Sequence, residues 1–275
     1  MIEPARWGHR RAILDAFDRL HLARPAVRAY EYALAAKSSL LGDRTQAGDG
    51  LPLPPARMRA QVGPLHADAR FFLESGRHNA ELIRSVVPLD EVDALLDWGC
   101  GCGRVLRHWS TLDGTRVYGC DITPRMVEWC NDNLPFARVA RNELAPPLPY
   151  GEATFGLVYA FSVMTHLSEE LQREWVAECR RVLKPGGYFV FSTLGEYFVS
   201  RDRLTPAERR SFEGGNLVVL YQRSSGTSLC SAYHPREYVS RELAEGFQVV
   251  SFRPAADDGR HDLHVLRKPG GQRGR

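Results

Sequence analysis

From Val92 onward the chain alternates short apolar runs with amphipathic segments of helical period. The apolar runs predict strands over 94–97, 115–121, 136–140, 154–162 and 188–193. The segments between them predict helices over 104–112, 124–134 and 168–183. Strands that alternate with helices of about ten to fifteen residues indicate βαβ units and a parallel sheet. We therefore predict an α/β fold with a doubly wound, Rossmann-like sheet.

The N-terminal part of the chain follows a purely helical pattern. Two helical stretches are separated by a Gly/Pro-rich break over 42–57. The apolar residues of the first stretch form two faces, one of Ile13, Leu14, Phe17 and Leu20 and the other of Val27, Tyr30 and Leu34. We expect residues 1–88 to form a helical extension that covers the sheet.

Beyond the fifth predicted strand, strands and helices no longer alternate. The alternation resumes with a helix predicted near 235–245. Two strand-like runs at 247–252 and 262–267 predict a β-hairpin at one edge of the sheet. We therefore expect a core over 89–268 that carries an inserted lid at 194–240. The Gly-rich residues 269–275 are expected to form a disordered tail.

Composition narrows the class of protein. The chain has 275 residues, 44% of them hydrophobic and 25% charged, with a formal net charge of +3. This weak net charge favours neither nucleic acid nor an anionic membrane as a partner, and no apolar run approaches the roughly 20 residues of a membrane span. The charged N-terminus lacks the apolar core of a secretory signal, and six cysteines without framework spacing indicate reduced thiols. We expect the protein to be cytoplasmic. A homodimer is a candidate for its assembly.

The strand over 94–97 runs into an acid and three alternating glycines, Asp97, Gly99, Gly101 and Gly103. A loop that enters a helix presents free N–H groups, and glycine there tolerates positive φ and leaves room for a ligand. Dinucleotide sites use G-x-G-x-x-G, whereas the early acid here would repel a pyrophosphate and suits an ammonium group. Asp121, about 20 residues further on, is placed to accept ribose hydroxyls. An ammonium at one end and a ribose at the other point to S-adenosylmethionine, which would leave as S-adenosylhomocysteine.

Four motifs follow one another in this region: DWGCGCG, YGCDI, FGLVYAFSVMTHL and RRVLKPGGYFVFST. Their order and spacing resemble the motif set of class I S-adenosylmethionine-dependent methyltransferases, over roughly residues 90 to 195. The variant GCGCGR, with THL after the fourth strand, resembles a bacterial branch that acts on small molecules or saccharides. The resemblance implies a seven-stranded, mostly parallel sheet whose last strand is antiparallel.

The resemblance also implies which residues hold the cofactor. Asp97, Gly99 and Gly101 would line the methionine end, Asp121 the ribose, and Ile122 the adenine. The full set implied is Asp97, Gly99, Cys100, Gly101, Asp121, Ile122, Asn142, Ala160 and Phe161. Within it, Asn142 would meet the adenine amine, and Ala160 and Phe161 would flank the sulfonium. The chain departs from the family at position 156, where glycine replaces the usual aspartate.

Cys100 and Cys102 allow another interpretation, a metal site completed by Cys120 or Cys130. Zinc pairs are usually two to four residues apart and need a second pair with matched spacing, which this sequence lacks. We therefore predict no metal, and we interpret these cysteines as small residues that fit a tightly packed turn.

Two histidines are candidate catalytic residues. His166 follows the fourth strand, at the edge of the sheet where ligands bind in such folds, and histidine can accept the proton of an acceptor hydroxyl near neutral pH. The alternative is a histidine that only hydrogen-bonds the backbone. His234, where the insertion returns to the core, is a second candidate base or a turn residue. On the last strand, Asp262 either orients a histidine such as His264 or blunts the sheet edge.

These observations predict an S-adenosylmethionine-dependent methyltransferase that acts on a hydroxyl or carboxyl oxygen of a small molecule, natural product or saccharide. The alternatives are N-methylation of a small-molecule amine, an NAD-dependent oxidoreductase, and a catalytically silent cofactor-binding partner subunit. Methylation of nucleic-acid bases is not expected, because the run PPLPY at 146–150 precedes the fourth strand instead of ending it.

Overall fold

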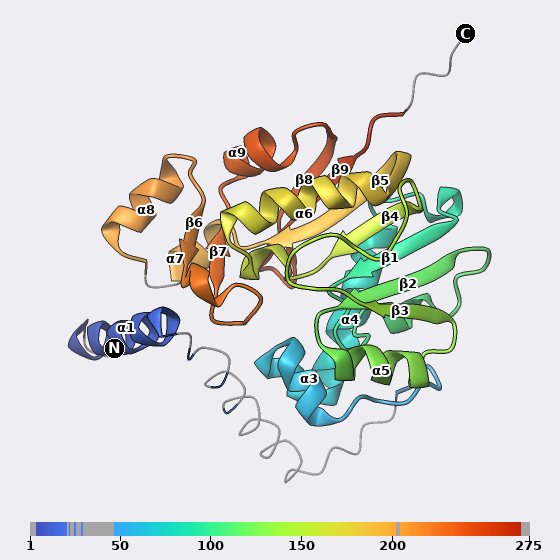
Figure 1. Cartoon of the computed structure of the whole chain (residues 1–275), viewed down its shortest axis with the longest axis horizontal. Helices are drawn as coiled ribbons and strands as arrows, with labels where there is room; N and C mark the ends of the chain where they lie inside the picture. Colours follow the sequence, from blue (N-terminus) through green and yellow to red (C-terminus); the bar gives the residue numbers. More distant parts are fainter. Residues whose placement is uncertain are drawn as a thin grey trace.

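The computed structural model describes residues 4–20, 47–201 and 204–270, together with positions 22, 25 and 29. Its centre is a seven-stranded sheet (Figure 1). In chain order the strands are β1 (Ala94–Trp98), β2 (Arg116–Asp121), β3 (Ala137–Arg141), β4 (Phe155–Ala160), β5 (Leu183–Thr193), β8 (Gln248–Asp257) and β9 (His261–Arg267).

The strands are arranged in the order β3-β2-β1-β4-β5-β9-β8. Strands β1 to β5 pair in parallel, and β9 runs antiparallel to both β5 and β8. The strand order reverses between β1 and β4, and ligands bind at the carboxyl ends of strands beside such a point. The predicted doubly wound sheet with a closing hairpin is confirmed.

Helices cover both faces of the sheet (Figure 1). One face carries α4 (Ala69–Arg84), α5 (Pro124–Asn133) and a 3₁₀ turn at Leu106–Trp109, and the other carries α6 (Glu169–Val182), α9 (Arg236–Tyr238) and a π-helical turn at Val239–Leu243. Consecutive residues of β1 show the division, because Leu95 packs toward α4 and Leu96 toward α6, and neither is exposed. Burial on both faces explains why the strands read as continuous apolar runs. Within the described ranges, no helix combines the length and the apolar character that a membrane span requires.

Two further parts lie beside the carboxyl edge of the sheet. The first is α3 (Ala56–Val62), which leads through a 3₁₀ turn at Pro64–Ala67 into α4. The second is the inserted segment, which contains α7 (Glu196–Arg201), α8 (Pro206–Glu213) and a small antiparallel sheet of β6 (Val218–Leu220) and β7 (Ser231–Tyr233).

Helix α1 (Pro4–Arg19) lies against this inserted segment (Figure 1). Arg11 donates two hydrogen bonds to the carboxylate of Glu208 in α8, and the hydroxyl of Ser224 donates to Asp18. Two residues of the predicted apolar face are exposed, Ile13 at 53% and Leu20 at 65%, whereas Leu14 and Phe17 are half-buried. The second predicted face, Val27, Tyr30 and Leu34, lies outside the described residues.

Two predicted elements have different limits in the structure. The segment 104–112 is not an α-helix, and only Leu106–Trp109 is helical, as a 3₁₀ turn. Here the buried guanidinium of Arg107 pairs with Asp49 and donates to two backbone carbonyls, so long-range polar contacts hold the segment. The strand predicted over 188–193 begins earlier in the structure, because residues 184–187 already belong to β5.

Candidate active site

The glycine loop leaves β1 in a left-handed backbone conformation. Gly99, Gly101 and Gly103 have φ angles of 79°, 54° and 81°, which side-chain-bearing residues rarely adopt. A Cβ at Gly99 would overlap Val163, and one at Gly103 would lie 2.6 Å from Cδ1 of Leu134. The glycines therefore let neighbouring segments of the chain pack closely against the loop.

Asp121, at the end of β2, fixes the glycine loop from the neighbouring strand. Its Oδ2 accepts the N–H of Gly101 at 2.9 Å, and its Oδ1 accepts the N–H of Thr123 at 2.8 Å. The Thr123 side chain is a third hydrogen-bond partner, and a carboxylate has about four acceptor positions, so the Asp121 carboxylate can accept a further bond. Asp121 is 9% exposed, and burial raises its pKa above the ordinary value. The arrangement fits a carboxylate that holds the two hydroxyls of a ribose.

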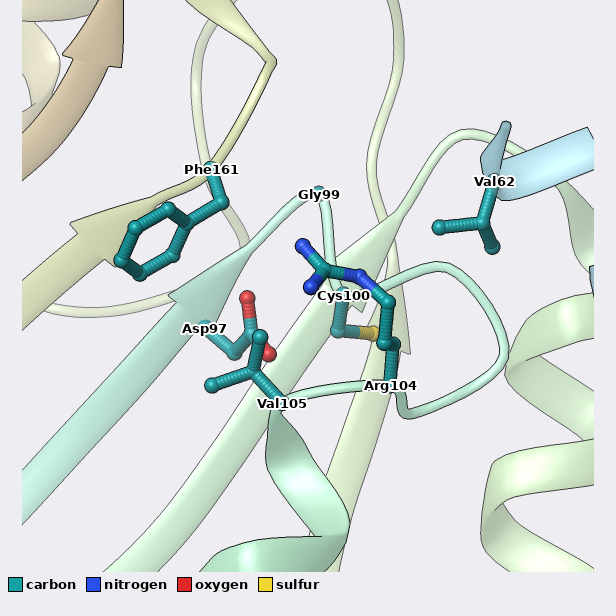
Figure 2. Close-up of a pocket in the computed structure, with 7 residues that line it drawn as sticks. All are labelled: Val62, Asp97, Gly99, Cys100, Arg104, Val105 and Phe161. Atoms are coloured by element: carbon teal, nitrogen blue, oxygen red, sulfur yellow. The ribbon is translucent and has the colours of Figure 1, made fainter. Parts of the chain in front are cut away.

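A pocket opens at the carboxyl end of β1 (Figure 2). It is lined by Val62, Asp97, Gly99, Cys100, Arg104, Val105 and Phe161. Asp97 is 3% exposed, and its Oδ2 has no hydrogen-bond partner among the described residues. Burial raises the pKa of Asp97 to about 7, against a hydrogen bond from Tyr159 and the charge of Arg104. A buried carboxylate oxygen of this kind calls for a donor, and a cationic donor satisfies it best.

Arg104 brings a cation into the same pocket. Its side chain is buried, with the whole residue 8% exposed, and Figure 2 shows the guanidinium lying near the Asp97 carboxylate and the glycine loop. Its Nη1 donates to Oδ1 of Asn79 at 2.5 Å, whereas its Nε has no partner in the part of the chain described. Burial lowers the pKa of Arg104, and the carboxylates of Asp257 and Asp97 act in the opposite direction.

The residues predicted at the adenine end lie on the neighbouring strands. The backbone N–H of Asn142, directly after β3, donates to the carbonyl of Asp121, and its side-chain Nδ2 donates to the carbonyl of Glu143 at 2.7 Å. The Oδ1 of Asn142 is buried and unpartnered within the described residues, so it can accept an N–H from a ligand. Ile122 is 37% exposed, which leaves an apolar surface beside Asp121.

Ala160 and Phe161 lie at the end of β4, opposite the glycine loop. Ala160 is fully buried, whereas Phe161 reaches the pocket and lies next to Asp97 and Gly99 in Figure 2. Four of the nine predicted cofactor residues therefore line the pocket itself, and the others lie at the carboxyl ends of the adjoining strands: Gly101, Asp121, Ile122, Asn142 and Ala160.

His166 lies in a 3₁₀ turn after β4 and is held by the inserted segment. Its Nδ1 lies 2.7 Å from the carbonyl oxygen of Cys230, and its own carbonyl accepts the N–H of Gly226 at 2.8 Å. A carbonyl only accepts, so Nδ1 carries the proton and Nε2 is the unprotonated nitrogen of the neutral ring. Burial lowers the pKa of His166, which keeps the ring neutral near pH 7. A neutral imidazole with a fixed tautomer is the form that can accept a proton.

His234 occupies a different environment. It is fully buried, its Nε2 lies 2.9 Å from Oε1 of Gln172, and burial lowers its pKa to about 3. Gln172 in turn donates to the carbonyls of Met164 and Leu167, which belong to the turn that carries His166. His234 thus connects the insertion to this turn.

Asp262 and His264 of β9 both make contacts within the fold. Asp262 Oδ1 accepts the N–H of Ala255 across the hairpin at 2.8 Å. His264 is 4% exposed, lies 2.9 Å from Thr193 Oγ1 through its Nε2, and stacks on Phe191.

All six cysteines are free and buried. Cys100 and Cys130 both contact the carbonyl of Gly101, at 3.6 and 3.5 Å. Their mutual hydrogen bond and burial raise the pKa of Cys100, and burial raises that of Cys102, so the thiols are neutral. Within the described ranges, the grouping with metal-ligand spacing is His78, Asp257 and Asp258, which contains no cysteine.

Several residues of this site escaped the sequence analysis. Arg104 directly follows Gly103, and its place at the end of the glycine motif could have predicted that it lies in the pocket. Val62 of α3 and Asn79 of α4 carried no signal, because only the folded chain brings these N-terminal residues to the loop.

Comparisons with known proteins show what the chain resembles. Residues 96–191 match the family model described as a methyltransferase domain. The 27-O-demethylrifamycin SV methyltransferase of Amycolatopsis mediterranei is 32% identical over 112 residues, which cover 38% of this chain and 40% of that protein. A Mycolicibacterium smegmatis protein named as a probable S-adenosylmethionine-dependent methyltransferase is 34% identical over 158 residues, which cover 58% of this chain and 51% of that protein.

Among solved structures, the fold is similar to that of 1,6-didemethyltoxoflavin-N1-methyltransferase of Burkholderia thailandensis, with a TM-score of 0.53 and 17% identity. The match covers 87% of this chain and 90% of that one. The segment 96–191 is therefore similar in sequence to methyltransferase domains, and the fold of the chain is similar to that of a solved methyltransferase. The chain spans about half the length, or less, of the curated relatives it matches.

Proposed function

We propose that this chain is an S-adenosylmethionine-dependent O-methyltransferase that acts on a hydroxyl or carboxyl oxygen of a small molecule, natural product or saccharide. The observation that carries the proposal is the set of buried polar atoms left without partners at the carboxyl edge of the sheet. Within the described residues, Asp97 Oδ2 and Asn142 Oδ1 are such atoms, and the Asp121 carboxylate retains acceptor capacity.

These atoms match the polar groups of the cofactor one by one. Asp97 would accept the ammonium group, Asp121 the ribose hydroxyls, and Asn142 the exocyclic amine of adenine, while Ile122 would pack on the adenine ring. S-adenosylmethionine, when bound, supplies a methyl group on a sulfonium that carries its own leaving group. The protein then has to align the acceptor, exclude water and receive a proton.

His166 would receive that proton. Its Nδ1–H is fixed on the Cys230 carbonyl, which makes Nε2 the ring nitrogen that would accept the proton of an acceptor hydroxyl. A carboxylate acceptor has no such proton, and with it His166 would only position the substrate. We assign His234 a positioning role, because it is fully buried and bonded to Gln172, which holds the turn of His166.

The choice of oxygen as acceptor rests on two points. The Amycolatopsis relative is by its name a methyltransferase of an O-demethylated rifamycin, which supports an oxygen acceptor. A neutral histidine base also suits a hydroxyl, whose proton has to leave during transfer, better than a neutral amine, which attacks without prior deprotonation.

The first test is ligand binding. S-adenosylhomocysteine should raise the melting temperature of the purified chain, and NAD⁺ and NADH should not. Stabilisation by NAD(H) alone would contradict the proposal and favour an oxidoreductase.

The second test is release of S-adenosylhomocysteine on incubation with panels of hydroxylated, carboxylated and amine acceptors. Turnover only with amines would assign N-methylation, and binding without turnover on any acceptor would favour a silent partner subunit.

A further inference from the structure

His261 begins β9 at the carboxyl edge of the sheet, outside the matched segment 96–191. Alternate residues of a strand share one face, so His261 lies on the same face as Leu263 and Val265. Those two residues pack in the same core as Phe161, whose side chain lines the donor pocket. His261 therefore lies on the pocket side of the sheet, at the edge where ligands bind in doubly wound folds.

The ring of His261 is oriented by Asp257 at the end of β8. Its Nδ1 lies 3.5 Å from Asp257 Oδ2, and Oδ1 of the same carboxylate accepts the side-chain N–H of Asn79 at 2.6 Å. Asp257 is 7% exposed and Asn79 is fully buried, so the carboxylate is held in place. A carboxylate only accepts, so Nδ1 carries the proton of the neutral ring and Nε2 is the unprotonated nitrogen.

Several charges act on this ring. Burial lowers the pKa of His261, and the charges of Arg260, Arg104 and His166 act in the same direction. The charge of Asp257 acts in the opposite direction, and the pKa remains below its ordinary value. The ring is therefore neutral near pH 7, and a neutral imidazole with its proton on Nδ1 can accept a hydrogen bond at Nε2.

This nitrogen is unused within the fold. Among the described residues, Nε2 of His261 makes no hydrogen bond, and 20% of the side chain is exposed. The ring of Phe198 in α7 lies 4.8 Å from it, centre to centre. Phe198 belongs to the insertion that also holds His166, so one segment contacts both histidines. His261 does not line the donor pocket, which leaves its Nε2 to the acceptor.

Two neutral imidazoles thus lie on the acceptor side, His166 after β4 and His261 at the start of β9. Strand β5 lies between these strands, so the ends of β4 and β9 are about 10 Å apart. A ring-sized acceptor can bridge such a distance with a hydrogen bond at each end.

We propose that His261, oriented by Asp257, accepts a hydrogen bond from a second hydroxyl group of the acceptor, while His166 faces the hydroxyl that is methylated. The proposal rests on the proposed function and narrows the acceptor to a ring with at least two hydroxyl groups, such as an aromatic diol or a sugar. His261 takes no proton in this arrangement. It selects the acceptor and orients it.

The test compares acceptors that differ in one hydroxyl group: catechol with phenol, and methyl glucoside with its monodeoxy analogues. Release of S-adenosylhomocysteine gives kcat/KM for each. The hydrogen bond predicts that kcat/KM is about tenfold higher for the acceptor with the additional hydroxyl group, mainly through a lower KM. Equal values within both sets would overturn the proposal, and so would a chain that binds S-adenosylhomocysteine but methylates no member of either set.

Variants then locate the effect. His261→Phe keeps a ring beside Phe198 and removes the nitrogen, so the preference for the additional hydroxyl group should fall to less than about twofold, with kcat unchanged. Asp257→Asn keeps an oxygen for the amide of Asn79, but its own amide can donate to Nδ1. The ring proton then moves to Nε2, and the preference should be lost as well. A purely structural role would slow both acceptors equally and leave the preference intact, which would contradict the proposal.

The position of the ring proton can be measured without an acceptor. In a nitrogen NMR spectrum at pH 7, with the His261 signals assigned from their absence in His261→Phe, Nδ1 should be protonated and Nε2 unprotonated. In Asp257→Asn this order should be reversed. A wild-type ring with its proton on Nε2 would overturn the proposal.

The matched control is His78→Ala. The Nε2 of His78 lies 3.2 Å from the carbonyl oxygen of Ala256, so this variant removes another histidine contact to the same hairpin. It should keep the wild-type preference, and a lost preference would assign the effect to the hairpin as a whole. The outcomes also separate the two proposals. If S-adenosylhomocysteine does not bind, the proposed cofactor is wrong; if it binds and the preference is absent, the cofactor stands and the role of His261 falls.

Discussion

Two regions meet at the carboxyl edge of the sheet: the glycine loop with Asp121, which forms the donor pocket, and the insertion over 194–240, which holds His166. In the first, the fixing hydrogen bonds join residues 20 and 2 positions apart, Gly101 and Thr123 to Asp121. In the second, His166 reaches Cys230 over 64 positions and Ser224 reaches Asp18 over 206. The contact between the glycine loop and Asp121 is local in sequence, whereas the turn of His166 is held by distant segments.

This difference predicts how each region responds to substitution. A change in the glycine loop or its acids should act on cofactor affinity, because these residues face the pocket. A change in the insertion should act on turnover and leave cofactor affinity nearly unchanged, because the insertion holds the turn of His166.

The largest effect is expected for the base. His166→Ala should lower kcat on a hydroxyl acceptor by about 100-fold to 10,000-fold, the usual contribution of a general base. The measurement is steady-state turnover, with the affinity for S-adenosylhomocysteine determined separately as the control. That affinity should change less than about twofold. A loss of turnover below tenfold would exclude proton transfer by this residue.

The next effect concerns the donor side. Asp121→Ala should weaken S-adenosylhomocysteine binding by roughly 100-fold, because it removes the acceptors of the ribose and leaves the buried N–H of Gly101 and the part-buried N–H of Thr123 without their acceptor. Calorimetric titration checks this value. The control is Asp132→Ala, an exposed acid on α5 that should bind as the wild type does. Unchanged binding by Asp121→Ala would place the ribose elsewhere.

A pH titration separates two effects of Asp97, whose pKa in the folded chain is about 7. Below pH 7 the carboxyl is protonated and cannot pair with an ammonium, so affinity for S-adenosylhomocysteine should rise up to about tenfold from pH 6 to 8. The free energy of unfolding should change with pH in the opposite direction. The folded state keeps the proton of Asp97 up to a higher pH than the unfolded chain does. The stabilisation that comes from this proton is therefore present below about pH 4 and is lost as the pH rises to 7.

Asp97→Asn is the comparison for both curves. It should flatten the pH dependence of affinity, and the difference in unfolding free energy between variant and wild type should grow between pH 4 and 7. Urea unfolding at several pH values measures the latter. Parallel curves for variant and wild type would show that another group titrates.

A smaller effect is expected from the insertion. Gly226 has φ of 80°, and a Cβ there would lie 2.6 Å from Cδ1 of Leu144. Gly226→Ala should therefore shift the loop that bonds His166 and lower kcat about tenfold. Gly114→Ala is the matched control, because Gly114 has φ of 75° with no atom within 4 Å of the added Cβ. Equal turnover in the two variants would contradict a positioning role of the insertion.

The smallest effect is expected where α1 meets the insertion. Arg11→Gln removes an ion pair to Glu208 whose side chains are each 22% exposed. It should lower the free energy of unfolding by roughly 0.2–1 kcal/mol, as partly exposed pairs do. Thermal unfolding measures this change. A loss of cofactor affinity instead would show that α1 acts on the donor side.

The same contrast explains how far the sequence could predict the structure. The alternation of strands and helices and the acids at the ends of β1 and β2 follow from apolar runs and glycine spacing, both of which are local signals. The 3₁₀ turn at Leu106–Trp109 could not be foreseen, because Arg107 is held by Asp49, a residue far away in the chain. Nor could the contact of Arg104 with Asn79, since neither residue type indicates its partner.

Tyr159 connects the Asp97 carboxyl in the pocket to Trp109 in the core. The indole N–H of Trp109 donates to the hydroxyl oxygen of Tyr159 at 2.7 Å, and Tyr159 hydrogen-bonds Asp97. The protonation state of the Asp97 carboxyl is thus coupled through Tyr159 to the indole N–H of Trp109. The chemical shift of this indole proton in a nuclear magnetic resonance spectrum should therefore change when a ligand in the pocket changes the state of the Asp97 carboxyl.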